Sequence, residues 1–396
     1  MRIYADNAAT TQVSDTAINA MLDCMKNIYG NPSNQVYSIG QEAKDKLEEC
    51  RAQIASIINA EPREIIFTSG GSEADNQALI SAAEYGRRRG KTHIISTAFE
   101  HHAILHTLKK LEKNGFEVTL LPVHEEGIVD VGELTAAIRD DTCLVTVMTV
   151  NNEIGTIQPI GEIGAVCREK GVFFHTDAVQ AVGHLPIDVK AQQIDMLSAS
   201  AHKFHGPKGV GFLYVKKGAP ISNLIEGGAQ ERGKRAGTEN IPGIVAMTAA
   251  LHESVEKMDS VKAHLTPIRD HIIKELSEIP HSALNGDAER RMYSNVNFSF
   301  EGIEGESLPI LLDQKGICAS SGSACTSGSL DPSHALLAIG RQHGVAHGSL
   351  RLSLGEDATM EEADYIIESV KEIVAHLRSF SPVWRDLQTG KREYIL

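Results

Sequence analysis

The sequence predicts an α/β fold with a mostly parallel central sheet and a smaller α+β domain towards the C-terminus. Short apolar runs alternate with helical patterns from residue 65 to residue 215. Alternation with short turns is typical of a parallel sheet covered by helices on both faces. After Gly243 the alternation gives way to one long helical pattern and two further strand-like runs. The chain has 396 residues, 42% of them hydrophobic, which is enough for a large core.

The first element, residues 1–15, is expected to be extended and to lead into a helix near Ser14. A turn-rich loop at 31–34 and an amphipathic helix at 40–58 follow. The predicted strands of the central sheet are apolar runs bounded by turn residues, at 65–68, 93–97, 117–121, 144–149, 172–176, 195–199 and 211–215. The predicted helices between them lie at 73–89, 101–113, 130–138 and 159–170.

The C-terminal part opens on a long helix at 243–278, in which Pro267 marks a point where the helix could break. The elements expected after it are a strand at 294–300, a helix at 306–315, a Gly/Ser-rich loop at 319–329, a strand at 349–354 and a helix at 360–378. We place the domain boundary inside the long helix. Residues 16–257 then form the large domain, and residues 1–15 with 258–396 form the small one.

Composition excludes several classes of function. A net charge of −14 leaves no basic face for nucleic acid. Six cysteines without a CxxC pair, in so long a chain, indicate a reducing compartment rather than a disulfide scaffold. The N-terminus does not read as a signal peptide, and no apolar run approaches the length of a membrane span. We therefore expect a soluble, cytoplasmic protein that binds no membrane.

Lys203 is the first residue that points to chemistry. It follows the small-residue run Leu197-Ser-Ala-Ser-Ala and precedes a turn with three glycines and a proline. A lysine held and partly desolvated between a strand and such a turn can have a lowered pKa and form a Schiff base with a carbonyl compound. Taken alone, the pattern is more often a surface lysine in a loop.

Two upstream features change that interpretation. Asp177 ends a predicted strand 26 residues before Lys203, and Gly70-Gly71-Ser72 stands between an apolar run and a helix. Backbone N–H groups at such a turn form an anion site, suited to a phosphate. A phosphate cradle, an acid that keeps a pyridine nitrogen protonated and a lysine that holds an aldehyde as an imine are what pyridoxal phosphate requires. Because ligands of open α/β sheets bind beyond the carboxyl ends of the strands, we expect Asp177, His101 and Asn152 to converge there.

Cys325 forms a second centre. It stands in Ser320-Ser-Gly-Ser-Ala-Cys-Thr-Ser-Gly-Ser329, without apolar neighbours to pack against. We expect an exposed, mobile loop from which a thiolate attacks something bound elsewhere; the alternative is a linker that happens to contain a cysteine. The other five cysteines lie in helix or strand patterns and are expected to have structural roles: Cys24, Cys50, Cys143, Cys167 and Cys318.

With both centres, the chain resembles the cysteine desulfurases of the NifS/IscS type, within the class V aminotransferase family of fold-type I pyridoxal phosphate enzymes. The resemblance runs from Ala5 to Trp384. The motifs that carry it are Thr68-Ser-Gly-Gly-Ser-Glu73, Glu100-His-His-Ala103, Val150-Asn-Asn-Glu-Ile-Gly155, His175-Thr-Asp-Ala-Val-Gln180, Ser200-Ala-His-Lys203, Glu231-Arg-Gly-Lys-Arg-Ala-Gly-Thr238 and the Cys325 loop. One departure is the segment Gly30–Tyr37, one residue longer than the family pattern, which borders the expected entrance to the site.

The resemblance implies a role for each matching residue. Lys203 is expected to hold the cofactor, Cys325 to take the sulfur and His101 to stack on the pyridine ring. The remaining roles are the ring-nitrogen partner Asp177, the ring-hydroxyl contact Gln180, the phosphate cradle Gly71, Ser72, Ser200 and His202, the residue Thr238 that reaches the phosphate of the other subunit, and the substrate-carboxylate groups Asn152 (also counted among the cofactor contacts) and Arg351. No metal site is expected.

The implied activity is conversion of L-cysteine to L-alanine, with a persulfide on Cys325 and sulfur transfer to an acceptor such as an iron–sulfur cluster scaffold. The resemblance also implies a homodimer. The alternatives are a selenocysteine lyase, a class V aminotransferase that has no use for Cys325, and a non-catalytic adaptor subunit.

Overall fold

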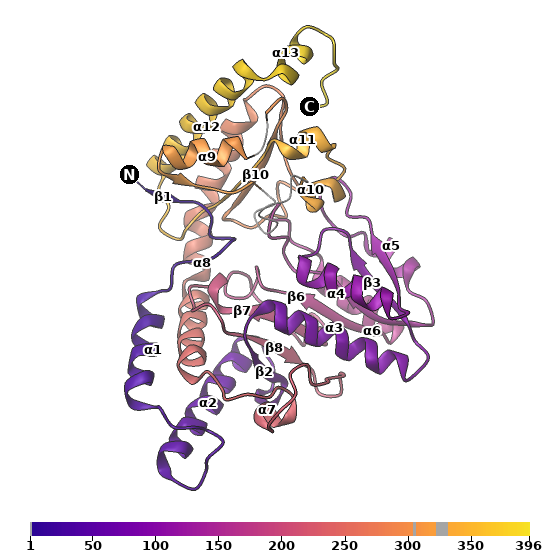
Figure 1. Ribbon diagram of the computed structural model, residues 1–396, viewed down its shortest axis with the longest axis vertical. Coiled ribbons are helices and arrows are strands. Elements are labelled where there is room, and N and C mark those ends of the chain that lie inside the picture. The colour runs from indigo at the N-terminus through magenta and orange to yellow at the C-terminus, as the bar shows by residue number, and fades with distance from the viewer. Residues whose placement is uncertain (1, 304–305, 322–331) are drawn as a thin grey trace.

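The structure is a computed structural model that describes residues 2–303, 306–321 and 332–396 (Figure 1). Its main sheet has the strand order β2-β8-β7-β6-β5-β3-β4. The strands are β2 Ile65–Thr68, β3 His93–Thr97, β4 Glu117–Leu121, β5 Thr142–Thr146, β6 Phe173–Asp177, β7 Met196–Ser200 and β8 Gly211–Val215. Strand β8 runs antiparallel to both neighbours and the other pairs are parallel. The predicted α/β class with a mostly parallel sheet is confirmed.

The seven predicted strands are all present. The largest shift is at β5, which ends at Thr146 rather than at residue 149. Beyond Thr146 the chain still bonds to β6 through the Val147 N–H to His175 O, the Thr149 N–H to Asp177 O and the hydroxyl groups of Thr149 and Thr176. The polar turn that follows therefore begins right beside the end of β6.

Helices cover both faces of this sheet. Side chains alternate along each strand, so the apolar strands present buried side chains to both faces. Ile66, Ile94 and Leu144 face a core formed with α3 and α4, whereas their neighbours Ile65 and Ile95 face the core shared with α2, α6 and α8. The helices are α2 Ser38–Ile57, α3 Gly71–Arg87, α4 His102–Lys113, α5 Val131–Ala137, α6 Ile160–Lys170 and α8 Ile241–Ser277.

Helix α8 connects the central sheet with the C-terminal part (Figure 1). It runs for 37 residues without the break considered at Pro267. Pro267 and Ala263, whose carbonyl loses its helical partner to the proline, both lie on the exposed side, where water can take the bond. Leu265 and Ile268 on the other side are buried. The helix therefore stays continuous.

The C-terminal part contains a three-stranded antiparallel sheet with the order β12-β10-β9 and the two-stranded parallel pair β1-β11. These strands are β1 Ile3–Tyr4, β9 Ser282–Leu284, β10 Asn295–Phe300, β11 Ile317–Cys318 and β12 Ser349–Ser353. The helices of this part are α9 Ser307–Gln314, α10 His334–Ala338, α11 His343–His347, α12 Met360–Phe380 and α13 Pro382–Gln388. The division into domains at residues 257 and 258 stays a prediction.

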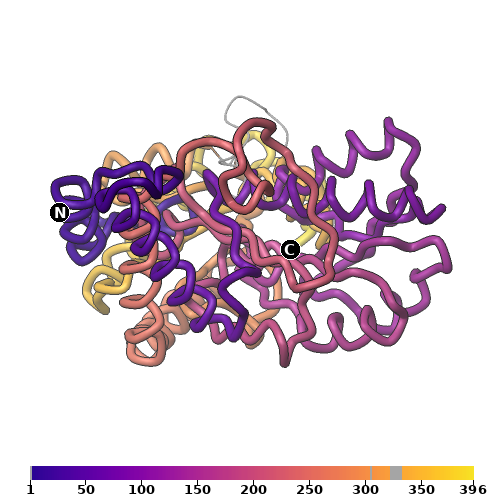
Figure 2. The backbone as a smooth tube through the Cα atoms, turned by 90° about the horizontal axis from the view of Figure 1, so that it is seen from below, coloured from indigo at the N-terminus to yellow at the C-terminus, as the bar shows by residue number. Residues whose placement is uncertain are grey.

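The N-terminal segment 5–11 crosses from one part to the other. Its start pairs with the C-terminal part, where the Ala5 N–H donates to Cys318 O at 2.9 Å, and its end reaches the lysine turn, where the Thr11 N–H donates to His202 O at 2.9 Å. Helix α1 Asp15–Asn27 then packs along α8. Figure 2 shows the N-terminal helices at one end of the molecule and the α4–α5 region at the other.

Two further observations concern the predicted core and surface. Cys24, Cys50, Cys143 and Cys167 are buried, as packing residues should be. Within the described parts of the chain, none of the helices combines the length and apolar character needed to cross a membrane.

Candidate active site

Lys203 stands on a tight turn that leaves the carboxyl end of β7. A Cβ on Gly206 would lie 2.8 Å from the Cβ of Ala201, so the turn can close only with glycine at that position. The Lys203 ammonium group donates to the carbonyl oxygens of Ala8 and Ala9, at 2.6 and 2.7 Å. The predicted reactive lysine is thus held between the turn and the N-terminal segment.

Asp177 is the last residue of β6 and is 5% exposed. Burial raises the pKa of its carboxyl group to about 6, against the opposing effects of the Val179 N–H, which donates to Oδ1 at 2.9 Å, and of the charge on Lys203. At pH 7 the group is mainly ionised. It can therefore face a protonated ring nitrogen, as the sequence predicted.

A buried polar cluster of Asp75, His175 and their hydrogen-bond partners lies near Asp177. Asp75 Oδ1 lies 3.7 Å from His175 Nε2, and the His175 ring is hydrogen bonded to Thr146 Oγ1 and Ser198 Oγ, at 2.9 and 3.0 Å. Burial, and then the charge of Asp177, raise the pKa of Asp75 well above its ordinary value. Burial also lowers the pKa of His175 to about 3. His175 is therefore neutral at pH 7, and the raised pKa of Asp75 favours its uncharged form beside Asp177.

His101 caps helix α4. Its Nδ1 accepts the Ala103 N–H at 3.1 Å. Burial, and then the nearby charge of Lys203, lower the pKa of His101 to about 4. The ring is therefore neutral at pH 7 with its proton on Nε2, which suits stacking on a ring and exchange of a proton.

Glu100, directly before His101, is completely buried. Burial raises its pKa to about 8, although its Oε1 accepts from Thr97 Oγ1 and the Met148 N–H at 2.7 and 3.0 Å. Glu100 is thus an uncharged acid at neutral pH. It supports the start of α4 without adding a second charge next to Asp177.

The turn before α3 forms the predicted cradle for an anion. Gly70 has a φ of +146°, which glycine adopts without strain. A Cβ on Gly71 would lie 2.6 Å from Val179 Cγ2 and 3.6 Å from the Cβ of Ser200. The backbone of this turn therefore lies close to Val179 and Ser200, and position 71 has room only for glycine. It stands at the N-terminus of a helix of 17 residues, where N–H groups attract a phosphate.

The other predicted cofactor contacts lie around this turn. His202 Nδ1 is hydrogen bonded to Thr10 Oγ1 at 3.1 Å, and burial with the charges of Lys203 and Lys208 lowers its pKa to about 4. Gln180 donates to Ala8 O at 2.9 Å. Together with the glycine turn before α3, this set of donors and acceptors fits pyridoxal phosphate, because the residues present include a suitable partner for each polar part of that cofactor.

Arg351 brings a buried cation to the site from β12. One amino group, Nη1, donates to Asn152 O at 3.0 Å, and the other, Nη2, donates to Asp6 Oδ1 at 2.7 Å. The predicted carboxylate-binding pair therefore does meet, although Arg351 contacts the backbone of Asn152.

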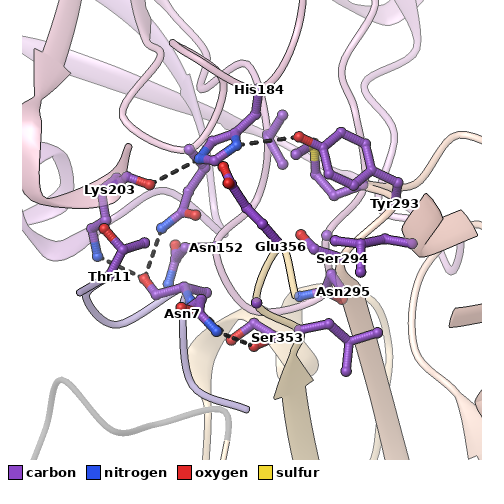
Figure 3. Close-up of a pocket in the computed structure, with 18 of the residues that line it drawn as sticks. Asn7, Thr11, Asn152, His184, Lys203, Tyr293, Ser294, Asn295, Ser353 and Glu356 are labelled. Atoms are coloured by element: carbon purple, nitrogen blue, oxygen red, sulfur yellow. Dashed lines mark hydrogen bonds between the residues drawn. The ribbon is translucent and has the colours of Figure 1, made fainter. Parts of the chain in front are cut away.

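A small cavity of about 40 Å³ lies beside Lys203. Figure 3 shows its walls, to which the N-terminal segment, the lysine turn and the C-terminal part all contribute. His184 Nε2 donates to Lys203 O at 2.8 Å, and its Nδ1 accepts from the Tyr293 hydroxyl at 3.2 Å. This chain ties the lysine turn to the C-terminal part of the molecule.

Ser72 and Thr238 are exposed, and Thr238 lies on the segment between α7 Gln230–Gly233 and α8. Cys325 lies outside the described residues. On one side of its loop, the backbone of Ser320 pairs with that of Arg351 through bonds of 2.7 and 3.2 Å. The segment that leads to Cys325 thus starts beside Arg351, the predicted carboxylate-binding residue.

Sequence reasoning missed Asp6, Asp75 and Glu100. Glu100 stands within a motif quoted above, and Asp75 follows Gly71 by four residues, one helical turn. A carboxylate on the sheet-facing side of a helix that opens at a phosphate turn is a usable signal. Asp6 and Glu100 needed the fold, because their partners are distant in sequence or are backbone groups.

Comparison with known proteins shows the family of this chain. The profile of the family described as aminotransferase class-V matches residues 3–366. A protein named cysteine desulfurase IscS from Clostridium botulinum is 52% identical over 395 residues, which cover 99% of both chains. A second, from Methanosarcina thermophila, is also 52% identical and covers 96% of this chain and 94% of its own.

Solved structures show the same similarity. A structure described as a NifS-like protein has a TM-score of 0.89 and 38% identity, covering 95% of this chain and 100% of its own. Another, described as SspA in complex with cysteine, has a TM-score of 0.77 and 34% identity, with coverage of 89% and 98%.

Proposed function

Because the chain belongs to the class V aminotransferase family, and within it to the IscS-type cysteine desulfurases, we propose that it converts L-cysteine to L-alanine and passes the sulfur to an acceptor. The observation that carries this proposal is that Lys203 and Arg351 both bond to one short segment of the chain. Residues 5–11 bond to the lysine through Ala8 and Ala9 and to the arginine through Asp6. A lysine that would hold the cofactor aldehyde, which reacts with amines, and a carboxylate-binding arginine on the same segment suit an α-amino acid.

Pyridoxal phosphate, when bound, supplies an aldehyde for the substrate amine and a ring that takes up electrons from the bond broken at Cα. Asp177, as an anion, keeps the ring nitrogen protonated. Lys203 would move the proton between Cα and its own amine, and neutral His101 would lie against the ring and relay a proton through Nε2. Arg351 and Asn152 hold the substrate carboxylate.

The cofactor phosphate is proposed to bind at the cradle formed by Gly71, Ser72, Ser200 and His202. Thr238 is proposed to complete that cradle in a second copy of the chain. Its exposure in the protomer supports this role, because a residue that serves a neighbour must lie on the surface. The proposed assembly is therefore a homodimer.

The sulfur step is proposed to take place at Cys325. Its thiolate attacks the substrate sulfur, an S–S bond forms and the Cβ–S bond breaks. The electron pair of that bond stays with the carbon, which takes a proton and leaves in alanine. The products are a persulfide on Cys325 and L-alanine, so atoms and electrons balance without a further oxidant.

An iron–sulfur cluster scaffold is the proposed acceptor, with docking at the C-terminal segment 381–396. Helix α13 lies at the end of the molecule remote from the central sheet (Figure 1), where a partner can approach without covering the cofactor cradle. A cytoplasmic location is part of the proposal, because the five described cysteines are free thiols.

The test is to record the visible spectrum of the purified protein, add L-cysteine with a thiol reductant, and assay alanine and sulfide together. Equal amounts of both products, with a cofactor band that shifts on addition of cysteine, support the proposal. A band without sulfide would point to an aminotransferase, and strong preference for selenocysteine to a selenocysteine lyase. If no cofactor band appeared even after the cofactor was added, the remaining interpretation would be a non-catalytic adaptor subunit.

A further inference from the structure

The guanidinium group of Arg351 already has an anionic partner within the protein. Arg351 is 2% exposed, and its Nη2 donates to Asp6 Oδ1 at 2.7 Å while Nη1 donates to the Asn152 carbonyl at 3.0 Å. Among the described residues, Nε of Arg351 is buried without a hydrogen-bond partner. The group therefore has an acid on one amino group and an unused donor on its side edge.

Asp6 cannot easily withdraw from this position. The backbone on both sides of it is fixed to the C-terminal part: the Ala5 N–H donates to Cys318 O at 2.9 Å, the Asn7 N–H to Ser353 O at 3.2 Å and the Ala8 N–H to Ser353 Oγ at 2.9 Å. Ser353 and Arg351 stand on the same strand, β12. The backbone next to Asp6 is thus bonded to the same strand that carries Arg351.

We propose that Asp6 is a resident counter-ion of Arg351, which the carboxylate of the substrate must share and which weakens the hold on amino-acid carboxylates so that product leaves. The inference rests on the proposed role of Arg351 in carboxylate binding. The substrate carboxylate would take the unused Nε–H and the second N–H of Nη2, the side edge that suits a bidentate carboxylate. Asp6 stays on Nη2, so that two anions face one cation.

Electrostatics gives the sign of the effect. Two carboxylates on one guanidinium group lie within a few ångströms of each other, where repulsion at a partly buried site is substantial. An asparagine at position 6 still accepts from Nη2 through its Oδ1 but carries no charge. Removal of the charge should therefore strengthen the binding of an amino-acid carboxylate, whereas a residue that merely positioned Arg351 would weaken binding when changed.

The experiment compares wild-type holoenzyme with Asp6→Asn, using L-alanine as the carboxylate probe. Its dissociation constant is measured from the change in cofactor absorbance, and independently from the rise in unfolding temperature with L-alanine concentration. We expect Asp6→Asn to bind L-alanine about tenfold more tightly. Cysteamine, an amine and thiol without a carboxylate, should bind both proteins equally.

Asp140→Asn is the matched control, since it makes the same chemical change at an exposed position outside the site; its affinity for L-alanine should equal that of the wild type. If Asp6→Asn does not fold, Asp6→Ser keeps an acceptor and removes the charge in the same way. Unchanged or weakened L-alanine binding, or equal tightening of cysteamine, would overturn the inference. Failure of the wild type to turn over L-cysteine would instead remove the proposed function, so the two failures are distinguishable.

Discussion

Gln180 and Lys203 donate hydrogen bonds to the same oxygen, the carbonyl of Ala8, at 2.9 and 2.6 Å. Gln180 comes from the turn after β6 and Lys203 from the turn after β7, so the N-terminal segment aligns the ends of two neighbouring strands. The same segment reaches Arg351 through Asp6. Residues far apart in sequence are thereby held around one small space (Figure 3).

Lys203→Arg should abolish the lysine-linked cofactor band and lower turnover of L-cysteine by at least about a thousandfold. Arginine keeps the positive charge and can still donate to the carbonyls of Ala8 and Ala9, but it cannot form an imine. The measurement is the visible spectrum together with alanine formation. Lys208→Arg, in the same turn and exposed, should behave like the wild type; if Lys203→Arg did too, Lys203 would not be the cofactor lysine.

Asp177→Asn should weaken binding of pyridoxal phosphate about tenfold or more at pH 8, because the anion that faces the ring nitrogen is lost. Since the pKa of Asp177 is about 6, the wild type loses its advantage as Asp177 becomes protonated. The ratio of the two dissociation constants should therefore shrink as the pH falls through about 6. Comparing ratios cancels titration of the cofactor phosphate, and a ratio that is the same at pH 5 and pH 8 would contradict this assignment.

Glu100→Gln should gain stability relative to the wild type as the pH rises. The pKa of Glu100 is raised from 4.5 to about 8 in the folded protein, so the folded state binds the proton more tightly than the unfolded state. That contribution is complete below about pH 4.5 and is lost as the pH rises through 8. Glutamine resembles the protonated form and has nothing to lose.

Unfolding temperatures of both proteins from pH 6 to pH 9 test this expectation. The difference, variant minus wild type, should increase by a few degrees over that range. A constant difference would show that Glu100 is ionised throughout.

Glu231→Gln should destabilise the protein by about 3 kcal/mol, because the buried Arg51 would lose its bidentate partner and keep only the half-exposed Glu48, whose Oε1 lies 3.2 Å from Arg51 Nε. The Arg51 guanidinium group donates to both oxygens of Glu231 at 2.7 Å, and the two side chains are 2% and 3% exposed. The neighbouring Arg232 pairs with Glu48 at 2.9 Å, but those side chains are 43% and 42% exposed. Arg232→Gln should therefore cost less than about 1 kcal/mol.

Urea unfolding of both variants measures the contrast, since they differ at adjacent positions that both have positive φ values. Equal losses of stability would mean that burial of the Arg51–Glu231 pair does not matter.

The periodicity of the sequence was sufficient for the central sheet, because each strand is a short apolar run that ends in a turn with its own signature. It did not reveal β9, which is three residues long and owes its pairing to β10, and it did not reveal that the extended N-terminus pairs as β1 with β11. A proline inside α8 suggested a break, but burial of the opposite helix face kept the helix continuous through it. Local sequence does not contain that information.

The candidate site divides in the same way. Lys203, Asp177 and the glycine turn could be predicted, since each follows a strand directly and carries a chemical requirement of its own. Asp6 could not, because its significance depends on Arg351, which lies 345 positions away in the chain. The raised pKa of Asp75 likewise depends on burial and on Asp177, which only the folded protein defines.

The most direct test of the central claim is to treat the protein with L-cysteine in the absence of reductant and determine the mass of the peptide that contains Cys325. We expect a gain of one sulfur atom on that peptide, together with one alanine for each sulfur, and neither stable sulfur nor rapid alanine formation in Cys325→Ala. Alanine and sulfide released at the wild-type rate by Cys325→Ala, with no sulfur found on Cys325 in the wild type, would contradict it.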